Sequence, residues 1–234
     1  MKKKLLMGMT VVMMMTTVVM GNAKQSSAKL RFRDKGDWCI PQGQVITEDQ
    51  YILMNGKKFI EDSNKVKYQS ANASILKAVT VKRYEMKRRG FKALKTGTTT
   101  VTASYKGKRV TCRVRIFSGF QMPTVKIKAT SKKYQVSITN PNNSAITVDK
   151  NKVILDYFGE SGGFGYGKIA GGHSIQIPAH AAKSFCFVTD KGEYCNPDAS
   201  RIGINYKGYK FTLSLPGKKG KAKLENPTWL NLKF

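Results

Sequence analysis

The sequence contains few of the residues on which enzyme active sites depend. Among its 234 residues there are only two histidines, His173 and His180, and neither lies in a metal-binding motif. No aspartate-rich calcium loop is present, and the glycine-rich run at 158–172 matches neither a P-loop nor a dinucleotide fingerprint. Cys186 with a histidine would make a nucleophilic pair, but a structural cysteine and two surface histidines are the simpler interpretation. We therefore predict no catalytic residues, no metal and no cofactor.

Acidic residues are also scarce, 14 against 42 Lys and Arg, which gives a formal net charge of +28. Residues 29–119 hold 21 basic and 7 acidic residues, and residues 120–234 hold 17 and 7. A field of this strength attracts polyanions and is sensitive to salt. Because no groove-reading helix or stacking-aromatic motif is present, we expect no specific nucleic-acid recognition. The expected partner is an anionic cell-wall polymer or a surface glycan or protein.

Long apolar runs are confined to the N-terminus. Three lysines precede an apolar run at 5–20, and the small residues Gly21 and Ala23 follow. This order is typical of a signal peptide, expected at 1–23 with cleavage after Ala23, or after Ala28 as a second choice. The run of 16 residues is short for a bilayer span of about 20. An uncleaved signal anchor is the alternative and would be the only membrane contact. We expect a secreted, cell-surface-associated protein.

Only four cysteines are present, Cys39, Cys112, Cys186 and Cys195. An even number in an exported chain permits disulfides. Cys186 and Cys195 flank a turn-like segment at 190–192, so a hairpin could bring them together, and Cys39 with Cys112 is then the remaining pair. The alternative is that some or all stay reduced as small core residues.

Helical periodicity is scarce after the N-terminal run, whereas short alternating β-branched and aromatic runs recur between turn residues. The clearest pair of strands spans 98–105 and 108–117 around Lys106-Gly107, with one apolar and one cationic face. A tight hairpin is predicted at 51–60 around Asn55-Gly56. These patterns predict an all-β chain.

Residues 118–123 interrupt the strand pattern and form the expected linker between two domains. Eight strands are expected after it, which suits a sandwich or jelly roll, with a closed barrel as the alternative. They are expected at 124–130, 134–140, 145–148, 153–158, 174–178, 184–189, 202–206 and 210–215.

Two segments of the second domain, which is expected at 124–234, are predicted to be irregular. The glycine-rich segment 158–172 is predicted to be a loop in which Phe164 and Tyr166 could contact a ligand. The lysines at 218–223 are predicted to form a solvated linker within a basic C-terminal tail.

The segment 90–116 has a distinctive order of residues. Gly90 opens a strand, Gly97 precedes the threonine-rich run 98–102, and the strand 112–116 closes the segment as Cys-Arg-Val-Arg-Ile. This order resembles the bacterial immunoglobulin-like group 2 repeat, and upstream Tyr68 stands where that family commonly has a core tryptophan.

The resemblance covers about residues 29–117 and implies an immunoglobulin-like β-sandwich, an extracellular location and a binding or spacing role without chemistry. The fold prediction is therefore all-β, with two tandem immunoglobulin-like β-sandwich domains after an N-terminal signal peptide.

Two basic runs are the strongest candidates for a binding site. The predicted polyanion-binding residues are Lys82, Arg83, Lys87, Arg88, Arg89, Arg109, Arg113 and Arg115. The alternative is a solvated face that only maintains solubility. The predicted function is a secreted or cell-surface, non-enzymatic module for binding, adhesion or structure. A carbohydrate-binding accessory module of the cell envelope is the second hypothesis, with stacking residues expected among Tyr84, Phe164, Tyr166 and Trp229.

Overall fold

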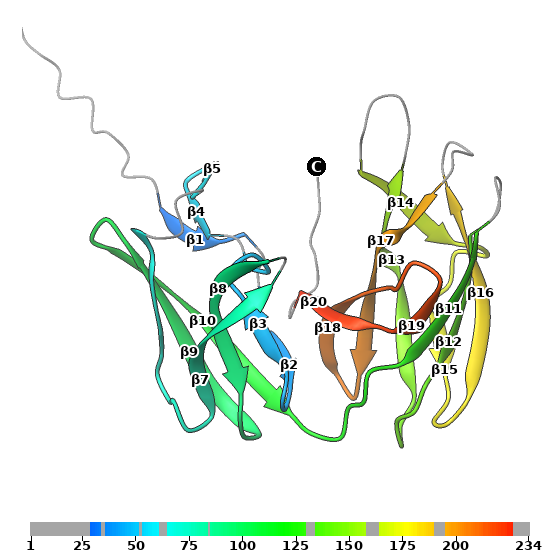
Figure 1. Ribbon diagram of the computed structural model, residues 1–234, viewed down its shortest axis with the longest axis horizontal. Helices are drawn as coiled ribbons and strands as arrows, with labels where there is room; N and C mark the ends of the chain where they lie inside the picture. The colour runs from blue at the N-terminus through cyan, green and yellow to red at the C-terminus, as the bar shows by residue number, and fades with distance from the viewer. Residues whose placement is uncertain are drawn as a thin grey trace, which may run out of the picture.

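A computed structural model of the chain describes residues 29–33, 36–51, 53–60, 65–83, 85–129, 134–157, 164–189 and 195–226. Its regular elements in these ranges are the strands β1 to β20, so the prediction of an all-β fold is confirmed (Figure 1). No helix in the described ranges is long and apolar enough to cross a membrane. The predicted signal peptide lies outside these ranges, as do Tyr84 and Trp229.

The first domain is built from the ten strands that precede the expected linker. They are β1 (Leu30–Phe32), β2 (Trp38–Pro41), β3 (Val45–Thr47), β4 (Leu53–Asn55), β5 (Lys58–Phe59), β6 (Lys67–Ser70), β7 (Leu76–Arg83), β8 (Met86–Ala93), β9 (Gly97–Tyr105) and β10 (Lys108–Phe117). Seven of them form two sheets, β2-β10-β9-β6 and β3-β8-β7, and β1-β4-β5 forms a small third sheet. A four-stranded and a three-stranded sheet enclosing one core is the immunoglobulin-like arrangement.

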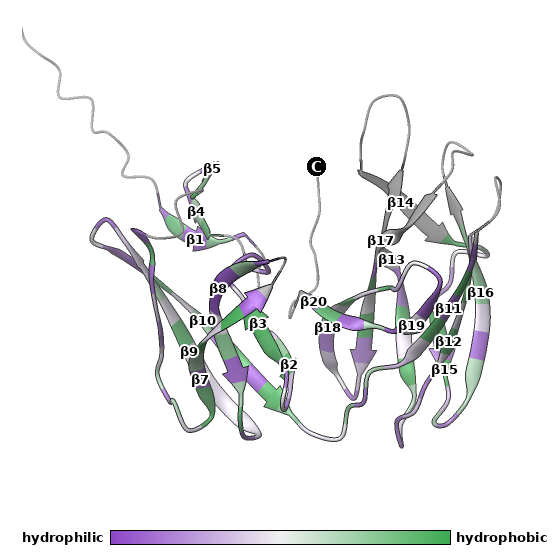
Figure 2. Cartoon of the chain, in the orientation of Figure 1, coloured by the Kyte–Doolittle hydropathy of each residue, from purple (hydrophilic) through white to green (hydrophobic). Residues whose placement is uncertain are grey.

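Both hairpins predicted from turn signals are present. β9 and β10 pair antiparallel from Gly97 to Tyr105, and the two turn residues Lys106 and Gly107 have positive φ angles of 47° and 76°. β4 and β5 form the second hairpin, which turns at Gly56 with a φ of 65°. Hydrophobic and hydrophilic bands alternate along the strands of this domain, as expected where one face of each sheet is buried (Figure 2).

The basic run at 82–89 also forms a hairpin. β7 and β8 pair over their full length, and the chain reverses beyond Arg83 and Met86 through Glu85, which has a φ of 61°. At the other end of β8, Gly90 lies so close to β3 that a Cβ atom there would collide with the Ile46 carbonyl oxygen. The glycine that opens the family-like segment is therefore explained by the close approach of two backbones.

An aromatic cluster fills one end of the first domain's core. The Trp38 ring is stacked on Tyr51 with centroids 4.8 Å apart, and the Tyr68 ring meets Tyr51 edge-on at 5.1 Å. Trp38 is 1% exposed and comes from β2. The resemblance places a core tryptophan at the position of Tyr68 on β6. In this chain the core indole comes instead from Trp38 on β2.

The second domain contains the remaining ten strands. They are β11 (Thr124–Ala129), β12 (Tyr134–Thr139), β13 (Ile146–Tyr157), β14 (Phe164–Ile169), β15 (Ile175–Ile177), β16 (Ala182–Thr189), β17 (Cys195–Tyr206), β18 (Tyr209–Ser214), β19 (Lys219–Lys221) and β20 (Lys223–Asn226). They form one sheet in the order β19-β11-β12-β16-β14-β13-β17-β18-β20, with β15 on β13. β19 and β20 are the first and last strands in this order, yet only Ala222 lies between them in the chain. The two ends of the sheet are therefore close together, and the sheet folds over a core that includes Val136, Ile146 and Phe211.

Three predictions for this domain were wrong. The strands expected at 145–148 and 153–158 are one strand, β13, whose pairing with β17 is interrupted by a register shift between Val148 and Val153. The glycine-rich segment expected to be a loop contains β14, which pairs with β13 and β16. Three of the four lysines expected to form a solvated linker, Lys219, Lys221 and Lys223, lie in β19 and β20, whose backbones pair with β11 and β18. In the last two cases, pairing with neighbouring strands satisfies the backbone N–H and C=O groups, and a composition rich in glycine or lysine does not reveal this pairing.

The predicted disulfides are not formed, because Cys39, Cys112 and Cys186 are free thiols. Cys39 pairs with Arg115 across the β2-β10 ladder, whereas Cys112 is three residues before Arg115, so the two thiols lie on opposite faces of the sheet. Burial raises the pKa of the Cys39 thiol and raises that of Cys112 to about 12. Both cysteines therefore serve as buried core residues.

The second predicted bridge fails because its expected hairpin does not exist. Cys186 lies on β16 and Cys195 on β17, and β14 and β13 separate these two strands in the sheet. The side chain of Cys195 is outside the described part of the chain.

The two domains are in contact. β18 lies beside β2, and β20 lies beside β3. The Phe117 and Tyr209 rings stack with centroids 4.2 Å apart, and the Gln50 amide donates to the Leu224 carbonyl at 2.8 Å. Gln50 is 5% exposed, so this hydrogen bond is sealed from water.

The expected linker is also held in place. The Tyr206 hydroxyl donates to the Gly119 carbonyl at 2.9 Å, and the Asn142 side chain bonds both the backbone N–H and the carbonyl of Gln121. Residues 118–123 therefore pack on the second domain.

Candidate functional site

The outer face of the β2-β10-β9-β6 sheet gathers one of the two predicted basic runs. On β10 it presents Arg109, Thr111, Arg113 and Arg115, opposite Ser104, Thr102, Thr100 and Thr98 on β9 and next to Lys67 and Gln69 on β6. We call this surface the Arg/Thr face. None of its four strands contains an Asp or Glu. The alternation that buries Val101, Cys112 and Val114 is what places these cations and hydroxyls on the opposite side.

The three arginines of β10 differ in what they contact. Arg113 forms an ion pair with Asp37 at 2.7 Å, and its side chain is 63% exposed. The Asp37 carboxylate raises the pKa of Arg113, first through a hydrogen bond and then through its charge. The Arg115 guanidinium lies 4.8 Å from the centre of the Tyr209 ring. Tyr209 belongs to the second domain, which covers this end of the Arg/Thr face. Arg109 is exposed and has no ion pair among the described residues.

The second basic run is divided between two sides of the β7-β8 hairpin. Pairing places Lys82 with Lys87 and Thr80 with Arg89 on the side that faces the other sheet, and Arg88 with Val81 on the outer side. Lys82 and Lys87 are exposed, and Lys82 pairs with Glu85. The side chain of Arg83 is not described. Because the two runs belong to opposite sheets of the sandwich, the structure does not bring all eight predicted residues together.

Arg89 has a structural partner. Its guanidinium donates to the Glu48 carboxylate at 3.0 and 2.9 Å and to the Val66 carbonyl at 3.0 Å. The Glu48 side chain is 8% exposed, so its charge is neutralised within the protein. Arg89 also lies 5.8 Å from the centre of the Tyr68 ring.

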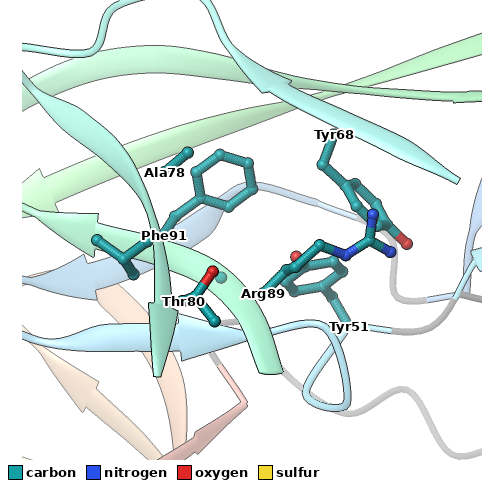
Figure 3. A pocket seen from close by; sticks show the side chains of 8 residues that line it. Tyr51, Tyr68, Ala78, Thr80, Arg89 and Phe91 are labelled. Atoms are coloured by element: carbon teal, nitrogen blue, oxygen red, sulfur yellow. The ribbon is translucent and has the colours of Figure 1, made fainter. Parts of the chain in front are cut away.

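A pocket of about 280 Å³ adjoins this ion pair at the edge of the sandwich. It is lined by Tyr51, Tyr68, Ala78, Val79, Thr80, Arg89, Gly90 and Phe91 (Figure 3). β6 and β7 are edge strands of opposite sheets, and the pocket opens between them. Ala78 contributes only a methyl group at a position paired with the large Phe91, which leaves the space unfilled.

Two tyrosine hydroxyls near the pocket are held in their neutral form. Burial raises the pKa of Tyr68 to about 12, with a further contribution from the Glu48 charge, while Arg89 acts in the opposite direction. Burial also raises the pKa of Tyr51 well above its usual range, and the neighbouring Tyr68 and Glu48 add to this. The Tyr51 hydroxyl oxygen is buried and has no hydrogen-bond partner among the described residues.

The remaining predicted residues do not form a site. Phe164 and Tyr166 lie on β14, not in a loop, and their side chains are not described. His173 and His180 are exposed, and a φ of 54° places His180 in a turn. Within the described residues no group of three or more His, Cys, Asp or Glu could hold a metal ion.

Sequence reasoning missed the pocket because Tyr51, Tyr68 and Arg89 are spread over almost forty positions. The sequence indicates only a core aromatic at Tyr68 and only a member of a basic run at Arg89. No local motif joins them, since their proximity depends on the pairing of β7 with β8 and on the packing of two sheets.

Comparisons with known proteins find similarity of structure only. No protein-family model matches the chain, and no curated protein sequence is detectably similar to it. The surface-layer protein SbsC, residues 31–844, is 13% identical with a TM-score of 0.32 over 84% of this chain and 25% of that one. Domains 5 and 6 of SbsC, 13% identical with a TM-score of 0.32, are matched over 86% of this chain and 99% of that one.

The adhesin InvE of Yersinia pseudotuberculosis is 9% identical with a TM-score of 0.22, over 85% of this chain and 58% of that one. This chain spans a quarter of the length of the longer SbsC structure. The function proposed below rests on the surface of this chain itself.

Proposed function

We propose that the protein is an exported, non-enzymatic cell-surface module that binds anionic surface polymers through the Arg/Thr face, and that residues 29–117 are a bacterial immunoglobulin-like group 2 domain. The observation that carries the proposal is the composition of this face. Lys67, Arg109, Arg113 and Arg115 lie on it, and its four strands contain no carboxylate. Among the described residues, Asp37, just before β2, forms an ion pair with Arg113 of this face.

The chemistry of the face suits a repeating polyanion. Arginine and lysine attract phosphate, sulfate or carboxylate groups, and the row of hydroxyls on β9 can donate hydrogen bonds to the same oxygens. The overall charge of +28 extends the attraction beyond the face and raises the rate of association. Binding of this kind depends on charge density rather than on sequence or stereochemistry, and it weakens as salt screens the charges.

The test is the affinity of the mature chain for heparin and for polyphosphate at several salt concentrations. Arg109→Glu is expected to weaken binding of both polymers by roughly three- to tenfold at physiological salt and to lower the salt slope by about one or two. Lys77→Glu is the matched control, because Lys77 is exposed on the other sheet of the same domain. Equal effects of the two substitutions would show that the net charge, and not this face, determines binding.

A further inference from the structure

The second domain has a cationic surface of its own, on the outer side of the neighbouring strands β19, β11, β12 and β16 (Figure 1). These four strands contain no Asp or Glu. The alternation that buries Val125, Val136 and Phe185 turns the intervening side chains outward. We call this surface the Lys/Ser face, and its residues include Lys126, Lys128, Ser137, Ser184, Lys219 and Lys221.

One row of side chains crosses all four strands of the Lys/Ser face. Lys219 on β19 lies opposite Lys126 on β11, which lies opposite Ser137 on β12, which lies opposite Ser184 on β16. Neighbouring strands are about 4.8 Å apart, so the row places two ammonium groups beside two hydroxyls. Both lysines and Ser184 are exposed, and Ser137 is half-buried. The row is therefore open to a ligand from solvent.

The fold places like charges together in this row. Lys126 and Lys219 are directly opposite, and Lys128 and Lys221 follow one row away on either side, about 7 Å along the strands. None of these four lysines forms an ion pair in the part of the chain that the structure describes. Like charges opposite each other in a ladder repel, and an anion between them removes that repulsion.

The chemistry of the face favours phosphate as that anion. Lysine binds phosphate as a compact charge, and its flexible stem can follow a mobile chain. The hydroxyls of Ser137 and Ser184 can donate hydrogen bonds to further phosphate oxygens. The three aromatic side chains of these strands are all buried, so the face has no ring on which a sugar or a base could stack.

We propose that the Lys/Ser face is a second polyanion site, which holds one phosphate between Lys126 and Lys219 and reaches adjacent phosphates of the same polymer through Lys128 and Lys221. The inference rests on the proposed function, because the ligand is again an anionic polymer, but it assigns a separate site to the second domain. Two sites on one chain bind a polymer long enough to reach both more tightly than either site alone.

The first measurement locates polyphosphate on the mature full chain at physiological salt. Exposed lysines are acetylated briefly with and without the polymer, and mass spectrometry measures the rate at each position. Lys126 and Lys219 are expected to react severalfold more slowly when polyphosphate is bound. Lys150, which is exposed on β13, is expected to react at an unchanged rate.

The second measurement is the affinity of a double variant, Lys126→Gln with Lys219→Gln. Both side chains are exposed, and glutamine keeps a polar side chain at each position, so the fold is expected to be retained. Polyphosphate is expected to bind roughly tenfold more weakly, with a salt slope lowered by about two. The matched control is Lys77→Gln with Lys150→Gln, which removes the same charge from exposed positions outside both faces.

The outcomes separate the two proposals. Equal weakening by the two double variants, or equal protection of Lys150, would overturn the second site and leave the Arg/Thr face unaffected. Protection of Lys126 and Lys219 that persists in Arg109→Glu at saturating polymer would support a separate site, and its loss there would overturn the separation. Absence of polyphosphate binding by the wild type would overturn the proposed function and this inference with it.

Discussion

At the scale of single residues, Tyr68 links packing to charge. It lies between the aromatic core and the Glu48–Arg89 ion pair, and burial is the main reason that its pKa is raised to about 12. The folded state therefore binds the phenolic proton more tightly than the unfolded chain, in which a tyrosine titrates near pH 10.

The raised pKa predicts a loss of stability at alkaline pH. The contribution of Tyr68 is fully present below about pH 10 and is lost as the pH rises toward its folded pKa of about 12. A difference of this size corresponds to up to about 3 kcal/mol of unfolding free energy. Urea unfolding between pH 9 and pH 12 is expected to show a steeper decline for the wild type than for Tyr68→Phe. Parallel declines would show that Tyr68 does not couple stability to pH, because both proteins share the same lysines.

At the scale of elements, β8 shows how one residue fixes the distance between strands. β8 is paired on both sides, with β7 and with β3, and Gly90 lies in both ladders opposite Val79 and Thr47. A Cβ atom at this position would meet the backbone of Ile46 rather than a movable side chain. The sheet can accept a larger residue only by separating β3 from β8.

Gly90→Ala is therefore expected to destabilise the protein by about 2 kcal/mol or more, measured by urea unfolding at neutral pH. Gly107→Ala is the control, because Gly107 has a φ of 76° in the β9-β10 turn but a Cβ added there would meet no atom within 4 Å. That substitution is expected to cost only the backbone strain, about 1 kcal/mol. A smaller loss in Gly90→Ala than in Gly107→Ala would contradict the close approach of β3.

At the scale of the whole molecule, the main feature is that the two domains share an interface. Tyr209 on β18 stacks on Phe117 with an interplanar angle of 10° and supports the Arg115 guanidinium. Gln50 donates to the backbone carbonyls of Leu224 and Glu225, on β20, and accepts a hydrogen bond from the Thr47 backbone N–H. Because these groups are removed from water, separating the domains would expose apolar rings and leave polar groups to be rehydrated.

The interface predicts cooperative unfolding. The wild type is expected to show one calorimetric transition, and the Gln50→Ala, Tyr209→Ala double variant is expected to show two, because each domain retains its own core. Tyr105→Ala, at a half-buried tyrosine outside the interface, is expected to lower stability without dividing the transition. Two transitions in the wild type would contradict the energetic coupling inferred from these contacts.

The local sequence determined much of the first domain. Alternation of apolar and polar residues from Thr98 to Phe117, with positive-φ turn residues between the strands, specifies a hairpin whose cationic face is set by the period of a strand. The all-β class follows from the same patterns over the whole chain. These features depend on neighbours within about twenty positions, so a single sequence contains enough information to predict them.

The tertiary structure alone decided the features that depend on distant segments. β14, β19 and β20 have glycine-rich or lysine-rich sequences and become strands because neighbouring strands offer them backbone partners. Cys39 and Cys112 stay apart because the parallel register of β2 and β10 places them on opposite faces. The pocket at Tyr51 and the domain interface at Gln50 and Tyr209 join residues far apart in the chain, and only the packing of sheets brings such residues together.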